Sequence, residues 1–159
     1  MNRRNFIQTT VAGSAIPFMG HSMYNDKPKM DKVRLGFIGV GLRGRNHLNV
    51  AINSDDVEIV AICDIDPDAI RRSQEMIKKK GRKEAVAYSK DGMDYLNLLK
   101  RDDIDGVVIA TPWELHVPMS VDSMRAGKYT AVEVSATVTL QESWDLVNTF
   151  EETGSHCMI

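Results

Sequence analysis

A glycine-rich run at residues 39–44 is the first part of the sequence that could do chemistry. Gly39, Gly41 and Gly44 have the spacing G-x-G-x-x-G and lie between an expected strand and an expected helix. In that context the glycines allow a tight turn, close approach of the backbone to a pyrophosphate, and close packing of the helix on the strand. The N–H groups and the positive dipole end of the helix would bind the phosphates. We therefore predict a dinucleotide phosphate site here, although the spacing alone is a weak signal.

An acidic residue follows the next expected strand, where such a site requires one. Asp64 comes directly after strand 57–63, about 20 residues after Gly44. Its carboxylate can accept hydrogen bonds from both hydroxyls of an adenosine ribose and would repel a 2′-phosphate, which favours NAD over NADP. The alternative is a glycine turn followed by an unrelated aspartate. Arg43 is either a phosphate or ribose contact or a solvated residue at the start of the helix.

Further polar residues follow the fourth and fifth expected strands. Ligands of doubly wound sheets bind outside the carboxyl ends of the strands, near the point where the strand order reverses. Trp113 could lie there against a cofactor, while Glu114 and His116 could reach ribose or ring groups. The alternative is a helix-capping turn with a packed tryptophan. Glu133 places another carboxylate on the same rim, and it is equally well explained as a surface charge at a strand end.

The elements that must position these residues alternate from residue 33 onward. Strands are expected at 33–39, 57–63, 85–88, 104–110, 129–134 and 156–159, and helices at 44–53, from Asp66 or Asp68 toward 80, at 93–99, 118–126 and 140–152. This alternation implies a parallel sheet with helices on both faces. We predict an α/β fold, a Rossmann doubly wound parallel sheet with strand order 3-2-1-4-5-6. His47, on the first helix, is expected to be a packing or surface histidine.

Residues 1–30 have the composition of an export signal. Arg3 and Arg4 are followed by Phe6 and then by a modest apolar stretch that glycine and proline interrupt. This pattern resembles a twin-arginine signal, which a receptor reads as an address. The alternative is a terminal segment with two chance arginines. We expect an exported, periplasmic protein, with the signal at 1–30 and the NAD-binding Rossmann domain at 31–159.

Charge and length exclude several other classes of protein. The chain has 159 residues, with 20 Lys+Arg against 22 Asp+Glu and a net charge of -2, which gives no electrostatic case for nucleic acid. It has no uninterrupted apolar run of about 18 residues, so we expect no membrane span. Its 2 cysteines do not have the spacing of a zinc site, and we predict no metal site.

Together, these motifs resemble the Gfo/Idh/MocA group of NAD-dependent oxidoreductases. The segments GLRG at 41–44, DVEIVA at 56–61, PWELH at 112–116 and EVS at 133–135 are more narrowly similar to glycoside hydrolase family 109. The resemblance covers about residues 33–159. It implies that NAD is the cofactor, bound by the loop glycines and the matching positions. The candidate cofactor-binding residues are Gly39, Gly41, Leu42, Arg43, Gly44, Asp64, Trp113, Glu114, Leu115, His116, Glu133 and Val134.

One departure from the broad group bears on the reaction. Its dehydrogenases usually carry Glu-Lys-Pro after the fifth strand, and the lysine assists proton transfer from the substrate hydroxyl. This chain has Glu133-Val134-Ser135 instead, as in the glycosidase family. The resemblance therefore implies an enzyme that hydrolyses terminal α-N-acetylgalactosamine. In that family the sugar is transiently oxidised at C3 and deprotonated at C2. The aglycone then leaves C1, water adds, and the hydride returns to C3.

Two other functions stay open, namely an NAD-dependent sugar or polyol dehydrogenase and a non-catalytic cofactor-binding fragment. In the family, the substrate contacts and acid/base residues come mainly from a following α+β domain, and we expect that domain to lie outside this sequence. We therefore expect the chain to be the truncated NAD half of a carbohydrate enzyme, inactive alone, and we nominate no catalytic residue. A homo-oligomer formed through the missing domain is a further expectation.

Overall fold

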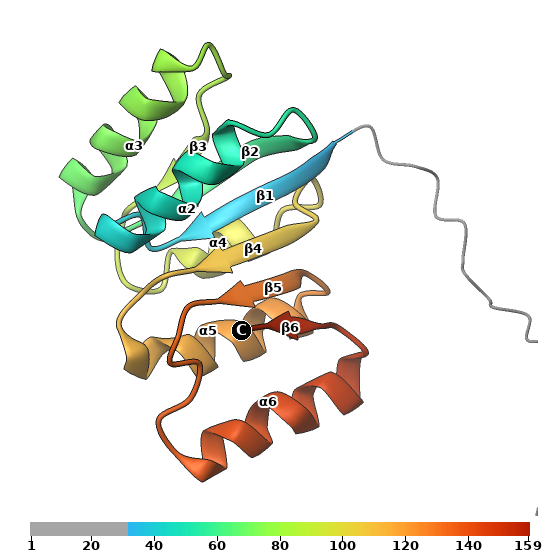
Figure 1. Cartoon of the computed structure of the whole chain (residues 1–159). Helices are drawn as coiled ribbons and strands as arrows, with labels where there is room; N and C mark the ends of the chain where they lie inside the picture. Colours follow the sequence, from blue (N-terminus) through green and yellow to red (C-terminus); the bar gives the residue numbers. More distant parts are fainter. Residues whose placement is uncertain (1–31) are drawn as a thin grey trace, which may run out of the picture. The chain divides into compact units, whose positions relative to one another are not determined.

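The computed structural model describes residues 32–159, so the predicted export signal at 1–30 lies outside the described residues. The described part contains a six-stranded sheet in the order β3-β2-β1-β4-β5-β6 (Figure 1). Every neighbouring pair of strands is parallel. The predicted α/β fold and its strand order are confirmed. The order reverses between β1 and β4, which places the carboxyl ends of these two strands at the centre of one edge of the sheet.

The strands and helices alternate along the whole described chain. The strands are β1 (Val33–Ile38), β2 (Val57–Cys63), β3 (Val86–Tyr88), β4 (Gly106–Ile109), β5 (Tyr129–Val132) and β6 (Cys157–Met158). The helices are α2 (Leu42–Ile52), α3 (Pro67–Lys79), α4 (Tyr95–Leu99), α5 (Trp113–Arg125) and α6 (Leu140–Thr153). None of the described helices is both long and apolar enough to span a bilayer.

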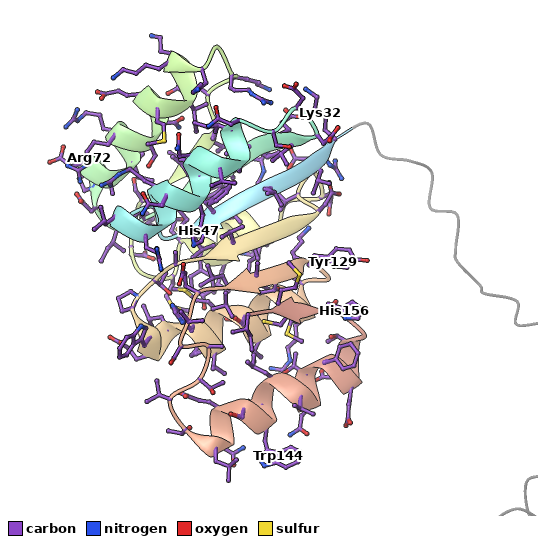
Figure 2. The ribbon with its side chains drawn as sticks, viewed as in Figure 1. Lys32, His47, Arg72, Tyr129, Trp144 and His156 are labelled. Carbon is purple, nitrogen blue, oxygen red and sulfur yellow. The ribbon has the colours of Figure 1, made fainter. Side chains whose placement is uncertain are left out.

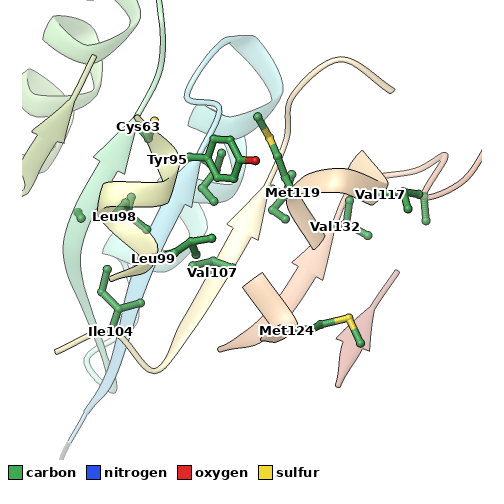
Figure 3. Close-up of a cluster of buried hydrophobic side chains, with 14 of the residues drawn as sticks. Cys63, Tyr95, Leu98, Leu99, Ile104, Val107, Val117, Met119, Met124 and Val132 are labelled. Atoms are coloured by element: carbon green, nitrogen blue, oxygen red, sulfur yellow. The ribbon is translucent and has the colours of Figure 1, made fainter. Parts of the chain in front are cut away.

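Two hydrophobic cores form because successive strand residues point to opposite faces of the sheet. Phe37 packs beneath α2 and α3 with Leu48 and Ile77. Its neighbour Ile38 belongs to the cluster on the other face, to which α4, α5 and α6 contribute Leu98, Met124 and Leu146. Figure 3 shows Leu98 and Met124 among the buried side chains of this cluster. Burial on both faces explains why the central strands are apolar throughout.

Local signals in the sequence fix the ends of several helices. Asp66, rather than Asp68, caps α3: its side chain accepts a hydrogen bond from the backbone N–H of Asp68 at 2.9 Å. Thr139 and Glu142 form a capping box at the start of α6. At the other end of α6, Gly154 has a φ of 69°, a conformation that suits glycine at the end of a helix.

The start of α5 differs from the prediction, and the difference matters for the site. The sequence predicts a helix at 118–126. The helix instead begins at Trp113 and contains Pro118 in its interior, where proline cannot donate to the carbonyl group of Glu114. Residues 113–116 are therefore the first turn of a helix. Likewise, α2 begins at Leu42, two residues before the expected start at Gly44.

Candidate cofactor-binding site

The loop between β1 and α2 needs a glycine at its first position. Gly39 has a φ of 84°, which L side chains rarely adopt. A Cβ atom at this position would also lie 2.6 Å from the carbonyl oxygen of Ala110, which follows β4. The Gly39 N–H donates a hydrogen bond to the Cys63 carbonyl at 2.8 Å. The loop is thus held tightly against the ends of both neighbouring strands.

The other two glycines have different roles. A Cβ atom on Gly44 would overlap the carbonyl oxygen of Gly39, so the first turn of α2 packs directly on the loop. A Cβ atom on Gly41 would meet nothing within 4 Å. Gly41 is also the N-cap of α2, and the first turn of that helix contains no acidic residue. The open space beside Gly41, next to N–H groups that no side chain caps, fits a pyrophosphate.

Asp64 is held in place on one side of this loop. Its Oδ2 accepts a hydrogen bond from the Val40 N–H at 2.8 Å, and its Oδ1 accepts one from the Asp66 N–H at 2.9 Å. Each carboxylate oxygen keeps a further lone pair for a ligand. Because Val40 belongs to the glycine loop, its hydrogen bond holds Asp64 beside the expected phosphate site. This position agrees with a contact between Asp64 and the adenosine ribose.

A cleft of about 250 Å³ lies between the ends of β2 and β4, with Asp64 among its lining residues. Its walls are mostly apolar, and burial raises the pKa of the Cys63 thiol in one wall to about 12, so that this thiol is neutral. A cleft with mostly apolar walls and a carboxylate in its lining suits the adenosine half of a dinucleotide. The lining includes Gly39, Gly41, Cys63, Asp64, Ile65, Thr111, Pro112 and Leu115.

Glu133 lies on the opposite side of the loop, where it forms a cluster with two residues of α2. Its Oε1 is 2.8 Å from Arg43 Nε and 2.5 Å from His47 Nε2, and its Oε2 accepts a hydrogen bond from the Val134 N–H at 3.1 Å. The contact with His47 is the largest cause of a lowered Glu133 pKa; partial burial opposes the shift and Arg43 adds to it. The carboxylate is therefore charged at neutral pH. Only 14% of its side chain is exposed, which does not suit the alternative of a free surface charge.

The sequence did not assign His47 a role, and the structure gives it one. Its side chain is partly exposed and lies where α2 passes the carboxyl ends of the central strands (Figure 2). Arg43 and His47 are four residues apart, so they share one face of the helix. That spacing is the signal that could have linked His47 to the predicted Arg43 contact.

His116 is turned into the protein, whereas its neighbours in the first turn of α5 face solvent. Its ring is 1% exposed, with Nδ1 2.8 Å from the Ser135 carbonyl oxygen and Nε2 2.8 Å from that of Thr111. An imidazole N–H group can donate a hydrogen bond to either of these carbonyl oxygens, and the tautomer decides which one receives it. His116 thus connects the segments that follow β4 and β5, and both ring nitrogens are occupied by backbone.

The remaining candidate residues form the exposed rim of the site. Trp113 is 62% exposed, and Leu42 is 79% exposed at the start of α2. Their exposure leaves them accessible to a ligand, and their role in binding stays a prediction. Glu114, Leu115 and Val134 are also exposed. Among the described residues, no cluster of three or more His, Cys, Asp or Glu side chains could hold a metal ion.

The fold and this loop together define a dinucleotide-binding domain of the Rossmann type. Residues 33–159 match the Gfo/Idh/MocA family, described as an oxidoreductase family with an NAD-binding Rossmann fold. The chain belongs to this family, and NAD is its cofactor.

Within this family, the chain is similar to proteins named as glycosidases. The chain is 40% identical to a glycosyl hydrolase family 109 protein of Shewanella pealeana, an alignment that covers 100% of this chain and 39% of the relative. It is 44% identical to an alpha-N-acetylgalactosaminidase of Shewanella oneidensis, over 83% of this chain and 29% of that protein. The chain thus spans well under half the length of these relatives.

Solved structures show the same fold. The WlbA dehydrogenase of Bordetella pertussis, solved in complex with NADH and UDP-GlcNAcA, has a TM-score of 0.66 and 26% identity, over 79% of this chain and 36% of that chain. The myo-inositol 2-dehydrogenase of Lactobacillus plantarum has a TM-score of 0.68 and 20% identity, over 80% of this chain and 35% of that chain.

Proposed function

We propose that this chain is the cofactor-binding part of an NAD-dependent glycosidase that hydrolyses terminal α-linked N-acetylgalactosamine. The observation that carries the proposal is the 44% identity to an alpha-N-acetylgalactosaminidase over residues that form a dinucleotide cradle. A hydrolase that flanks the scissile bond with two carboxylates has no need of such a cradle. A glycosidase that removes and returns a hydride does need one.

In the proposed reaction, oxidation of the sugar at C3 makes the neighbouring C2–H acidic. A base takes the C2 proton, and the aglycone leaves C1 with the bonding electrons. Water then adds across the resulting double bond, with its hydroxyl going to C1 and a proton to C2. The hydride then returns to C3, so the net reaction is hydrolysis with no net oxidation. NAD supplies the hydride chemistry when bound, and the described residues bind and orient it. We assign none of them to the proton transfers.

The proposed NAD site uses the three parts described above. The Gly41 cradle and the start of α2 would hold the pyrophosphate, and Asp64 would accept the adenosine ribose hydroxyls. The nicotinamide half would then extend across β4 toward Glu133, with Trp113 and Leu42 on the rim. This arrangement is supported by the strand order, because it puts β2, β1, β4 and β5 side by side.

A sugar dehydrogenase is the second candidate. It is favoured by the fold shared with the two dehydrogenases, one of them solved with NADH and a nucleotide sugar. Against it, Glu133 is followed by Val134 and Ser135, and neither side chain can serve as the amine that would assist proton transfer.

The activity test uses the product of the complete reading frame. The purified protein is assayed on p-nitrophenyl α-N-acetylgalactosaminide in deuterated water, before and after removal and return of NAD. We expect hydrolysis that requires bound NAD, no net NADH, and deuterium at C2 of the released sugar. Hydrolysis without deuterium at C2 would contradict the elimination mechanism. Net NADH with an oxidised sugar would establish the dehydrogenase instead.

We also propose that the protein is exported, on the strength of Arg3 and Arg4 ahead of an apolar stretch. Cell fractionation should find the wild type in the periplasm, and the variant with Arg3→Lys and Arg4→Lys in the cytoplasm. Equal distribution of both proteins would argue against a twin-arginine signal.

A further inference from the structure

The Glu133 cluster has a composition that the binding of NAD does not itself require. Two donors from α2, Arg43 Nε and His47 Nε2, meet on the same carboxylate oxygen. The other oxygen accepts from the Val134 N–H. A carboxylate with this many donors, and with a lowered pKa, is a poor proton acceptor at neutral pH. Glu133 would therefore act through its fixed negative charge and not as an acid or a base.

The strand order indicates which part of the cofactor this charge would face. Asp64 follows β2 and marks the adenosine side, while the pyrophosphate cradle follows β1. Glu133 follows β5, on the far side of β4. Three strand spacings, roughly 14 Å, separate β2 from β5. A dinucleotide that begins at Asp64 and crosses the loop therefore brings its nicotinamide end toward Glu133.

The nicotinamide ring is the part of NAD whose charge changes in the reaction. It is positively charged when oxidised and neutral when reduced. A fixed negative charge nearby stabilises the oxidised form more than the reduced form, and it does so more strongly where water is partly excluded. Movement of the carboxylate into solvent would weaken that preference.

We propose that His47 is a positioning residue that, with Arg43, fixes the Glu133 carboxylate beside the nicotinamide and so favours oxidised over reduced cofactor. This proposal rests on the NAD placement given above. It provides a reason for the contact of His47 with Glu133, which lies 86 positions further along the chain. It also suits an enzyme that must return its hydride, because a preference for the oxidised form drives that return.

The test measures dissociation constants of NAD⁺ and NADH for the 159-residue chain by calorimetry and by NADH fluorescence. Glu133→Gln removes the negative charge and leaves Arg43 unpaired. The dissociation constant of NAD⁺ should therefore rise about tenfold more than that of NADH. His47→Leu should shift the same ratio about threefold. His47→Gln places an amide N–H near the position of Nε2 and should restore the wild-type ratio.

A double variant separates positioning from a general effect on folding. If His47 acts through Glu133, His47→Leu adds no further change in the ratio when Glu133 is already Gln. Additive shifts, or equal weakening of NAD⁺ and NADH by Glu133→Gln, would overturn the proposal while leaving NAD binding intact. A wild-type chain that binds neither form would instead count against the proposed function. Thermal unfolding of each variant shows whether it is folded.

Discussion

Gly41 and Gly44 lie three residues apart in the same loop, yet different constraints act on them. At Gly44 the limit is steric, because a Cβ atom would overlap the Gly39 carbonyl oxygen. At Gly41 there is open space, and the constraint is the ligand expected to fill it. With Gly39, the motif therefore contains two glycines that the fold requires and one that the cofactor is expected to require.

These two constraints predict opposite outcomes for the same substitution. Gly41→Ala should leave the melting temperature nearly unchanged but weaken NAD binding at least tenfold, because the new methyl group enters the cradle. Gly44→Ala should lower the stability by about 2 kcal/mol or more, because backbone must move. Thermal unfolding and calorimetric titration of both variants check this. Unchanged NAD affinity in Gly41→Ala would contradict the assigned cradle.

Asp64 gives a second prediction at the residue scale. In Asp64→Asn the amide group must point its own N–H₂ at one of the two backbone N–H groups that the carboxylate now satisfies. We expect a loss of NAD affinity of about tenfold, in line with a hydrogen bond to a charged group. Discrimination against NADP should shrink, because the negative charge is gone.

The matched control for this variant is Asp68→Asn, which alters an exposed carboxylate on α3 that pairs with Arg71. This control substitution should change neither the affinity for NAD nor the affinity for NADP. If both variants lower the affinity for NAD equally, a general loss of negative charge would explain the result. The predicted contact between Asp64 and the ribose would then be wrong.

Residue identity and spacing allowed part of this site to be predicted. The glycines and Asp64 have fixed distances along the chain, so their pattern is visible in the sequence. The contact between His47 and Glu133 is not visible, because it joins residues 86 positions apart that meet only in the folded chain. The inward direction of the His116 ring was hidden for a related reason: it depends on where α5 begins.

At the scale of elements, β1 and β4 are joined by a side chain as well as by the sheet. Asp105, just before β4, accepts hydrogen bonds from the backbone N–H, Nε and Nη2 of Arg34 on β1. This contact lies at the opposite ends of the strands from the glycine loop, since Arg34 is near the start of β1. It fixes the register of the two strands at whose carboxyl ends the cofactor is expected.

The charge of Asp105 should make this contact depend on pH. Arg34 holds the pKa of Asp105 below its ordinary value, against an opposing effect of burial. The unfolded chain therefore binds the proton more readily. The stabilisation is fully present above the ordinary value of about 3.9 and is lost as the pH falls toward the lowered value. Asp105→Asn should lower the melting temperature by a few degrees at pH 7, and the difference should shrink below pH of about 4.

Thermal unfolding between pH 3 and 7 measures this gap, with Asp102→Asn as the control because Asp102 is an exposed neighbouring carboxylate. A gap that stays constant over the whole range would show that the hydrogen-bond geometry, and not the charge, matters at Asp105.

Element boundaries were less predictable than element types. Periodicity located every strand and helix, since a buried parallel strand and an amphipathic helix differ clearly in pattern. The predicted start of α5 at Pro118 is wrong, because the helix begins at Trp113 and contains this proline. A proline inside a helix costs stability that the surrounding packing offsets only in the folded protein. Tertiary contacts of this kind leave no local signal in the sequence.

At the scale of the whole molecule, NAD should act as a stabilising ligand of the folded chain. A ligand present at 100 times its dissociation constant stabilises the folded state by about 2.7 kcal/mol. For a domain of this size, the melting temperature should rise on the order of 10 °C. A thermal shift titration with NAD measures the effect. NADP should give a smaller rise, and so should NAD with Gly41→Ala, because a tenfold weaker affinity reduces the stabilisation to about 1.4 kcal/mol. Equal rises in all three cases would argue against a specific site.

The whole-molecule topology was predictable because it follows from strand–helix alternation and the handedness of parallel connections. The same edge of the sheet collects residues from β1, β2, β4 and β5, which is how one ligand can meet residues from 39 to 134. Substrate specificity did not follow from the topology, since this fold carries many reactions and the described residues provide the cofactor side of the site.

The hydrogen bonds from Val40 and Asp66 to Asp64 also affect how quickly and how tightly a cofactor can be captured. A free carboxylate on the surface samples several rotamers, and a ligand that selects one of them loses about 0.5–1.5 kcal/mol of affinity to side-chain ordering. Here that loss of conformational entropy has already occurred during folding. The side chain therefore meets its ligand in one orientation, and binding does not have to order it again.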